Sequence, residues 1–279
     1  MIGYKDLKKS AKHKMAGNWP QILLTVMLIG IIYVSLSVVS SSSDTLNLGD
    51  LLLLLLEGPV LIGFSTFMLQ LIKTQKANVN DFFMSFANII KWMLAGLWKF
   101  LWYFLWLLLF IVPGIIKYFS YSQYYFILAD NPDADLRQAL KTSIKMTKGY
   151  KGALFVVYLS FLNWYAFIVA IYVVAVWTLE LGMAIIVGTL LSIPVYVYLV
   201  PYITGTFAEI YEYLKERAIA EQVCSPDEFG IAEQLAPFHY AADKTDDEKD
   251  TEKDTEKDTE KDAEKDAEKD AEIEDTDKQ

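Results

Sequence analysis

The feature that most constrains this chain is a series of long apolar segments that carry almost no charge. They lie at 20–39, 51–72, 92–112, 115–129, 153–176 and 183–203. A hydrocarbon core about 30 Å thick needs about 20 apolar helical residues to cross it. Only helices and closed barrels satisfy their backbone polar groups there. The segments therefore predict an all-α, polytopic membrane helix bundle of about six transmembrane helices within residues 20–206.

The formal net charge of −10 belongs to the C-terminal tail. Residues 243–279 hold 8 Lys against 19 Asp and Glu, whereas residues 1–242 hold 17 Lys and Arg against 16. Five TEKD or AEKD tetrads follow one another from Thr251. Because such a segment has no apolar face to bury, we predict a disordered acidic tail. It is either a solubilising extension or a competitor of anionic lipid for the basic helices.

The distribution of Lys and Arg predicts how the chain is threaded, because cytoplasmic loops carry the excess. With residues 1–19 inside and six spans, the inner segments hold 15 of these residues, and the outer segments hold only Lys117. Ile115–Ala129 is short, so it either crosses or returns inward as a hairpin broken at Pro113-Gly114. We predict a plasma-membrane protein with both termini cytoplasmic, residues 207–242 forming a cytoplasmic helix and linker.

Two segments predict basic helices at the inner surface. In the first, Tyr4, Leu7, Ala11, Met15 and Trp19 form one apolar stripe. The basic residues of the two segments are Lys5, Lys8, Lys9, Lys12, Lys14, Arg137, Lys141, Lys145, Lys148 and Lys151. Such helices can lie in the membrane interface and bind anionic lipid head groups. The alternative for the first is a positive flank that only orients the first span.

The second basic helix is predicted over residues 131–149. Asn131 suits its N-cap and Pro132 its first position, and Gly149 suits its end. Asp133 and Asp135 resemble a metal-binding DxD pair. Acidic residues at a helix start, which complement the helix dipole, are the simpler explanation.

Two charged residues interrupt the apolar segments, and such residues are functional candidates by default. Glu57 and Lys99 are predicted to differ in depth by about 10 Å at ~1.5 Å per residue, too far for a direct ion pair. In the structural interpretation, Gly58-Pro59 breaks the second span beside Glu57, and Lys99 extends toward the cytoplasmic side. The alternative is that Glu57 lines a polar cavity or proton path.

Small residues in the last span predict a helix-packing surface. Ala184, Gly188 and Ser192 repeat every fourth residue, which lets another helix approach closely. Ala166 and Ala170 in the fifth span offer the same spacing. We expect these two spans to pack together, with homodimerisation as the alternative.

Catalytic signatures are missing from the sequence. It contains no GxxxxGK[ST], HExxH, GxSxG or GxGxxG motif. One Cys and two His rule out a Cys/His metal site. We predict no enzymatic activity, no cofactor, no metal and no nucleic-acid partner.

Several segments resemble one family of membrane proteins. The most specific are Val112-Pro113-Gly114-Ile115-Ile116-Lys117 and Phe126-Ile127-Leu128-Ala129-Asp130-Asn131-Pro132. Others are Leu7-Lys8-Lys9-Ser10-Ala11, Gly17-Asn18-Trp19, Gly58-Pro59 with Gly63, Ser120-Tyr121-Ser122, Lys145-Met146, Lys148-Gly149 and Pro201-Tyr202. Together they resemble an uncharacterised integral-membrane family of Gram-positive bacteria, the domain of unknown function 975, over roughly residues 4–215. The resemblance implies a multi-pass membrane protein and supplies no catalytic residues.

Two classes of function stay open. The basic surface helices favour a non-enzymatic membrane protein that organises, assists or regulates partners. Glu57 and the Pro/Gly-interrupted spans favour a small transporter, an exporter subunit or a lipid-handling protein.

Overall fold

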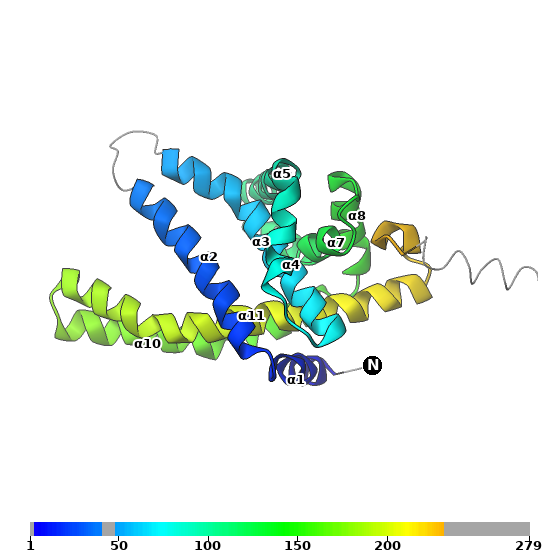
Figure 1. The fold of residues 1–279 in the computed structure, drawn as a ribbon. Coiled ribbons are helices and arrows are strands. Elements are labelled where there is room, and N and C mark those ends of the chain that lie inside the picture. Colours follow the sequence, from blue (N-terminus) through cyan, green and yellow to red (C-terminus); the bar gives the residue numbers. More distant parts are fainter. Residues whose placement is uncertain (1–2, 41–47, 232–279) are drawn as a thin grey trace, which may run out of the picture. The chain divides into compact units, whose positions relative to one another are not determined.

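The computed structural model describes residues 3–40 and 48–231, and the predicted tail at 243–279 lies outside them. The described residues up to Gly230 belong to one compact unit. Its described residues form helices joined by short turns, without a strand (Figure 1). The helices are α1 Tyr4–Met15, α2 Trp19–Ser40, α3 Leu48–Thr74, α4 Val79–Met84, α5 Ile89–Leu109, α6 Ile111–Ser120, α7 Tyr124–Asp130, α8 Leu136–Met146, α9 Lys151–Leu159, α10 Leu162–Thr178 and α11 Leu181–Ala220, with single 3-10 turns η1 Ser85–Asn88 and η2 Pro226–Phe229. The predicted all-α fold is confirmed.

Five helical regions of the described chain are long and apolar enough to cross a membrane. They are Trp19–Leu36, Gly49–Thr74, Val79–Leu109, Lys151–Thr178 and Leu181–Ala220. Each overlaps one predicted span, and α2 begins one residue before the predicted start, with Pro20 in its first turn. The predicted break at Gly58-Pro59 is wrong, because α3 continues through Pro59. A proline removes one backbone donor, which neighbouring groups in a membrane helix can offset.

The predicted helix at 115–129 is instead two short helices separated by a turn at 121–123. The break before them lies at Phe110, whose backbone is extended, with φ −158° and ψ 137°. Pro113 therefore falls in the first turn of α6, where its missing N–H costs nothing. The predicted break at Pro113-Gly114 is thus displaced by three residues.

Helix α6 packs against α5, and α7 continues the returning segment against α3. Near the start of α6, a Cβ atom on Gly114 would lie 3.0 Å from the Cα atom of Leu107. Beyond the end of α7, the carbonyl oxygen of Pro132 accepts a hydrogen bond of 2.6 Å from Lys91 Nζ at the start of α5. Residues 111–130 therefore return toward the level at which α5 begins, and whether they cross a membrane or form a hairpin stays a prediction.

The second predicted surface helix starts later than expected. Helix α8 begins at Leu136, and its N-cap is Asp135, whose carboxylate accepts a 2.7 Å hydrogen bond from Arg137 N. The predicted N-cap Asn131 instead accepts a hydrogen bond from Asp133 N, which forms a turn before the helix. An Asx turn of this kind competes with helix initiation. The helix therefore begins only after Asp135, the next residue whose carboxylate can cap it. Gly149 has φ +88°, a conformation that favours glycine.

Helices α3 and α11 hold the unit together. Helix α3 contacts α2, α5, α7 and α11, and its residues Phe67, Met68 and Leu71 are fully buried. Helix α10 lies along the first half of α11 in Figure 1. The second half of α11 continues the same helix to Ala220, so the helical extension predicted after the last span is present. It contacts α1 and α8, and its Tyr211 and Lys215 reach Asp130 at the end of α7.

Candidate functional site

The two intramembrane charges line one cavity. Glu57 on α3 and Lys99 on α5 border a space of about 420 Å³ that is closed by α6 and α7. Four tyrosines line much of it, namely Tyr103, Tyr118, Tyr121 and Tyr125. Lys99 also borders a second cavity of about 180 Å³, whose lining includes Ser65, Ser122 and Thr204. The cavity predicted as one alternative for Glu57 therefore exists in the fold.

A pair of glycines brings the two charges to a similar level. A Cβ atom on Gly58 would lie 2.1 Å from the backbone oxygen of Trp92 and 3.0 Å from the backbone nitrogen of Gly96. Glu57 and Lys99 lie one and three residues from this crossing, which leaves an offset of roughly 3 Å at ~1.5 Å per residue. The predicted offset of about 10 Å along the helices is thus wrong. Both α3 and α5 start three residues earlier than the predicted spans.

The Lys99 side chain points into the cavity instead of toward a helix end. Its Nζ atom lies 3.8 Å from the centroid of the Tyr125 ring. A cation–π contact of this kind holds an ammonium group without neutralising it. Glu57 lies close enough to attract Lys99 electrostatically, although the two form no direct ion pair in the described structure. Lys99 also borders the second cavity beside Ser65 of α3, and its extension toward the cytoplasmic side stays a prediction.

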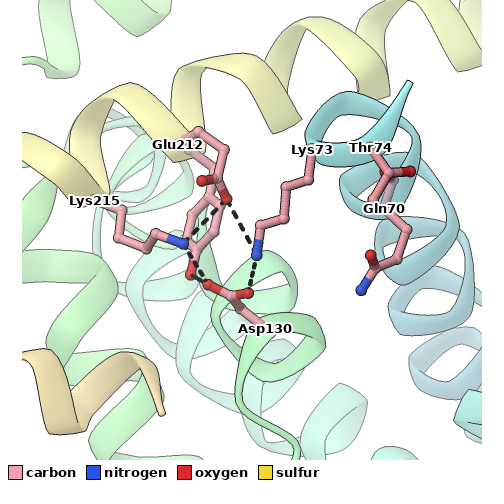
Figure 2. A network of polar contacts seen from close by, with 7 residues as sticks. Gln70, Lys73, Thr74, Asp130, Glu212 and Lys215 are labelled. Atoms are coloured by element: carbon pink, nitrogen blue, oxygen red, sulfur yellow. Dashed lines mark hydrogen bonds and ion pairs between the residues drawn. The ribbon is translucent and has the colours of Figure 1, made fainter. Parts of the chain in front are cut away.

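A second polar site joins α3, α7 and α11 around Asp130, at the C-terminal end of α7. Figure 2 shows Lys73 and Lys215 converging on its carboxylate. Asp130 Oδ2 accepts hydrogen bonds of 2.8 Å from Lys215 Nζ and 2.9 Å from the Tyr211 hydroxyl, and Oδ1 pairs with Lys73. Glu212 lies 3.2 Å from Lys215 Nζ and 3.5 Å from Lys73 Nζ. We call these five residues the Asp130 cluster.

The charges of the Asp130 cluster balance one another. Burial by itself would raise the pKa of Asp130, but attraction to Lys73 and hydrogen bonds from Lys215 and Lys73 outweigh it and hold the pKa below its usual value. Asp130 is therefore ionised at neutral pH and opposes two ammonium groups, together with Glu212. Within residues 3–40 and 48–231, no group of three or more His, Cys, Asp or Glu could hold a metal ion. The cluster is thus suited to clamping three helices.

Two further ion pairs join elements that are distant in sequence. Glu209 on α11 is 10% exposed and pairs with Lys14 on α1 at 2.8 Å. Glu228 in η2 pairs with Lys145 on α8 at 2.9 Å, and it also accepts a hydrogen bond from Thr142. Each pair fixes a basic helix to the C-terminal half of α11 or to the turn that follows it.

The predicted basic residues therefore divide into two groups. Lys14 and Lys145 are paired, while Lys8 donates a 2.7 Å hydrogen bond to Ser160 and lies 3.8 Å from the Phe161 ring centroid. Lys151 is half-buried. The others are exposed and have no carboxylate partner in the described structure: Lys5, Lys9, Lys12, Arg137, Lys141 and Lys148. The exposed group is the cationic surface of α1 and α8.

The apolar stripe of α1 packs on protein. Leu7 is 6% exposed, and Ala11 and Met15 are fully buried, where α1 contacts α11 and α3. A Cβ atom on Gly205 of α11 would lie 2.7 Å from Met15 Sδ. An amphipathic pattern does not distinguish a protein partner from a lipid one, and here a neighbouring helix covers the stripe.

The small residues of α11 lie at its contact with α10. Ala184, Gly188 and Ser192 are all buried. A Cβ atom on Gly188 would lie 2.8 Å from the Tyr172 ring, and the Tyr172 hydroxyl is 3.0 Å from Thr189 Oγ1. Ala166 and Ala170, expected on the α10 side, are exposed instead. The small residues of α11 therefore make room for the Tyr172 ring of α10, and not for small residues on that helix.

The Asp130 cluster was not predicted from the sequence. A local signal exists, because Tyr211 and Lys215 are one helical turn apart and share a face of α11. Asp130 lies in the most specific of the segments that resemble a family, directly before Asn131-Pro132. Tyr211 and Lys215 lie 81 and 85 residues after Asp130, and no local sequence pattern indicates that they contact it.

Comparison with known proteins identifies the family and no closer relative. A family model described as "Protein of unknown function (DUF975)" matches residues 1–120 and again residues 107–218. No curated protein and no solved structure matches the chain. The matches cover the spans, the cavity and the Asp130 cluster, and they end before the acidic tail.

Proposed function

Since the chain belongs to this family of proteins of unknown function, we propose that it is a non-enzymatic, multi-pass protein that organises or assists partners at the cytoplasmic face of the bacterial plasma membrane. One observation carries the proposal. The two basic segments both attach to the C-terminal part of the unit, α1 to α11 through the Lys14–Glu209 pair and α8 to η2 through the Lys145–Glu228 pair. The Asp130 cluster joins α3 and α7 to the same half of α11. We call this region the platform.

The platform combines rigidity with an open charged surface. Its ion pairs bury Glu209 and Lys215 almost completely, which fixes α1, α3, α7 and α11 to one another. The cationic surface of α1 and α8 is left to face solvent. A fixed positive surface beside apolar helices suits an anionic partner, either lipid head groups or an acidic protein segment.

The proposed threading makes a direct prediction. A reporter fused after residue 45 is expected outside the cell, and reporters after residue 150 and at the C-terminus are expected inside. The reason is that 15 Lys and Arg lie on segments assigned to the inner side. Paired reporters active on only one side of the membrane measure this. An external signal after residue 150 would contradict the six-crossing arrangement.

The organising role is tested by crosslinking in the native host. Photo-reactive residues placed at Lys9 and Lys141 are expected to give discrete adducts that fall several-fold when Lys5 and Lys12 are changed to glutamine, because removing charge weakens recognition of an anionic partner. The same residue at Leu190, exposed on α11, is the control. Adducts that do not respond to the neutralised lysines would argue against an electrostatic platform.

A second function has its own support. The Glu57–Lys99 cavity favours a small transporter, an exporter subunit or a lipid-handling protein, since ionisable groups inside a membrane are costly and usually serve a ligand or ion. It needs no contribution from the platform, so the two proposals can fail separately.

A further inference from the structure

We propose that the cavity between Glu57 and Lys99 binds a zwitterionic group, with the ligand's ammonium toward Glu57 and its phosphate or carboxylate toward Lys99. The inference rests on the cavity-based second function and names its ligand class. The ligand would contact none of the ion pairs of the platform, because no residue of α11 borders this cavity.

The first step is that neither charge forms an ion pair with a described residue. The Glu57 carboxylate accepts no hydrogen bond from the described residues, and its electrostatic attraction to Lys99 acts across the cavity. The Lys99 ammonium is held over the Tyr125 ring, 3.8 Å from its centroid. Ionisable groups on apolar membrane helices are costly and usually compensated by a partner. A ligand that forms ion pairs with both side chains would therefore gain binding free energy from each of them.

The second step is the sign of the charges. The cavity presents one carboxylate and one ammonium, so it is neutral as a whole. A simple anion would pair with Lys99 and leave Glu57 uncompensated, and a simple cation would do the reverse. A group that carries both charges satisfies both side chains at once, as charge complementarity requires.

The third step is the size and position of the cavity. A space of about 420 Å³ holds a small polar group with room to spare, and aromatic rings line it. Phe100, one of its lining residues, is 45% exposed, and Glu57 is exposed as well. The cavity therefore opens on the side of apolar helices α3 and α5. Tyrosine rings near an ammonium group add cation–π attraction.

Two sources could supply such a group. One is a membrane lipid with a zwitterionic head group, which would enter from the side where Phe100 is exposed. The other is a free zwitterion such as an amino acid. The recognition chemistry is the same, and binding assays can separate the sources.

Native mass spectrometry of the full-length protein in detergent tests the proposal. We expect phosphatidylethanolamine to bind in preference to phosphatidylglycerol with the same acyl chains, or free phosphoethanolamine or glycine to bind. Glu57→Gln and Lys99→Met are each expected to lower that binding about tenfold or more, because each leaves one ligand charge unpaired. Glu216→Gln and Lys76→Met, at exposed positions outside the cavity and the cationic surface, are the matched controls and should bind as the unchanged protein does.

Some outcomes would identify the source of the ligand, and others would overturn the proposal. Lipid adducts alone identify the lipid source, and binding of the free zwitterions alone identifies the soluble one. Equal binding of both lipids, or binding that survives Glu57→Gln and Lys99→Met, would overturn the proposal. The variants should fold, because neither replacement adds volume or buries a new charge, and their melting temperatures check this. The platform crosslinks are expected to be the same in these variants, so a failure here leaves that proposal standing.

Discussion

Replacing Gly58 with alanine is expected to destabilise the helix bundle by about 3 kcal/mol, at the upper end of the cost of overpacking. The added Cβ atom would lie 2.1 Å from the Trp92 carbonyl oxygen. The obstacle is backbone, so no side-chain rotation relieves it, and α3 and α5 must separate. Equilibrium unfolding in mixed micelles measures the change. The same separation would widen the cavity beside Glu57.

Two other glycines supply the controls. Nothing lies within 4 Å of a Cβ atom on Gly30 in α2, so Gly30→Ala is expected to be neutral or stabilising by up to about 1 kcal/mol. Gly96→Ala faces Gly58 across the same crossing, with its Cβ atom 2.8 Å from Gly58 Cα, and should fall between the two. A Gly58→Ala protein as stable as Gly30→Ala would show that the crossing is loose.

The long apolar helices could be predicted because their signal is local. A charge-free run from Pro20 to Val39 has few alternatives, and α2 follows it closely. The turn at 121–123 could not be predicted, since Tyr121, Ser122 and Gln123 include no proline or glycine. Pro113 gave a misleading signal, because proline is as compatible with a first helical turn as with a break. Local residue types therefore identified the spans better than their interruptions.

The contacts between distant segments were predictable only in part. The charge count assigned the segments between the predicted spans at 73–91 and 130–152, and the part after residue 203, to one side. Lys73, Asp130 and Lys215 from these segments do meet. Which carboxylate receives which ammonium depends on the packing of α7 between α3 and α11. The depth estimate for Glu57 and Lys99 was wrong for a related reason, because the glycine crossing and not the helix length sets their relative level.

The Asp130 cluster and the cavity depend on the same packing. Helix α7 contributes Asp130 at its C-terminal end and Tyr125 near its start. The cluster therefore fixes the helix whose tyrosine holds the Lys99 ammonium. Loosening the cluster is expected to disturb the cavity, although the ligand contacts none of the residues in it.

Replacing Asp130 with asparagine is expected to cost about 3–5 kcal/mol of unfolding free energy, as breaking a buried ion pair usually does. Lys215 is only 8% exposed and would keep its charge beside a neutral amide. Asp133→Asn, at an exposed position three residues on, is the matched control and should stay within about 0.5 kcal/mol. Equal stability of the two variants in mixed-micelle unfolding would contradict the clamp.

The pH dependence of stability distinguishes loss of the Asp130 charge from a change in side-chain packing. The pKa of Asp130 is lower in the folded protein than the ~3.9 of an unfolded chain. Its contribution is therefore fully present above about pH 4 and is lost as the pH falls through the folded pKa. The melting temperature of the unchanged protein should decline below about pH 4, and Asp130→Asn should flatten that decline. Adding Lys215→Met to Asp130→Asn should recover part of the lost stability, because it removes the stranded ammonium. If the two changes were instead additive, Asp130 would act through its other partners, Lys73 and Tyr211.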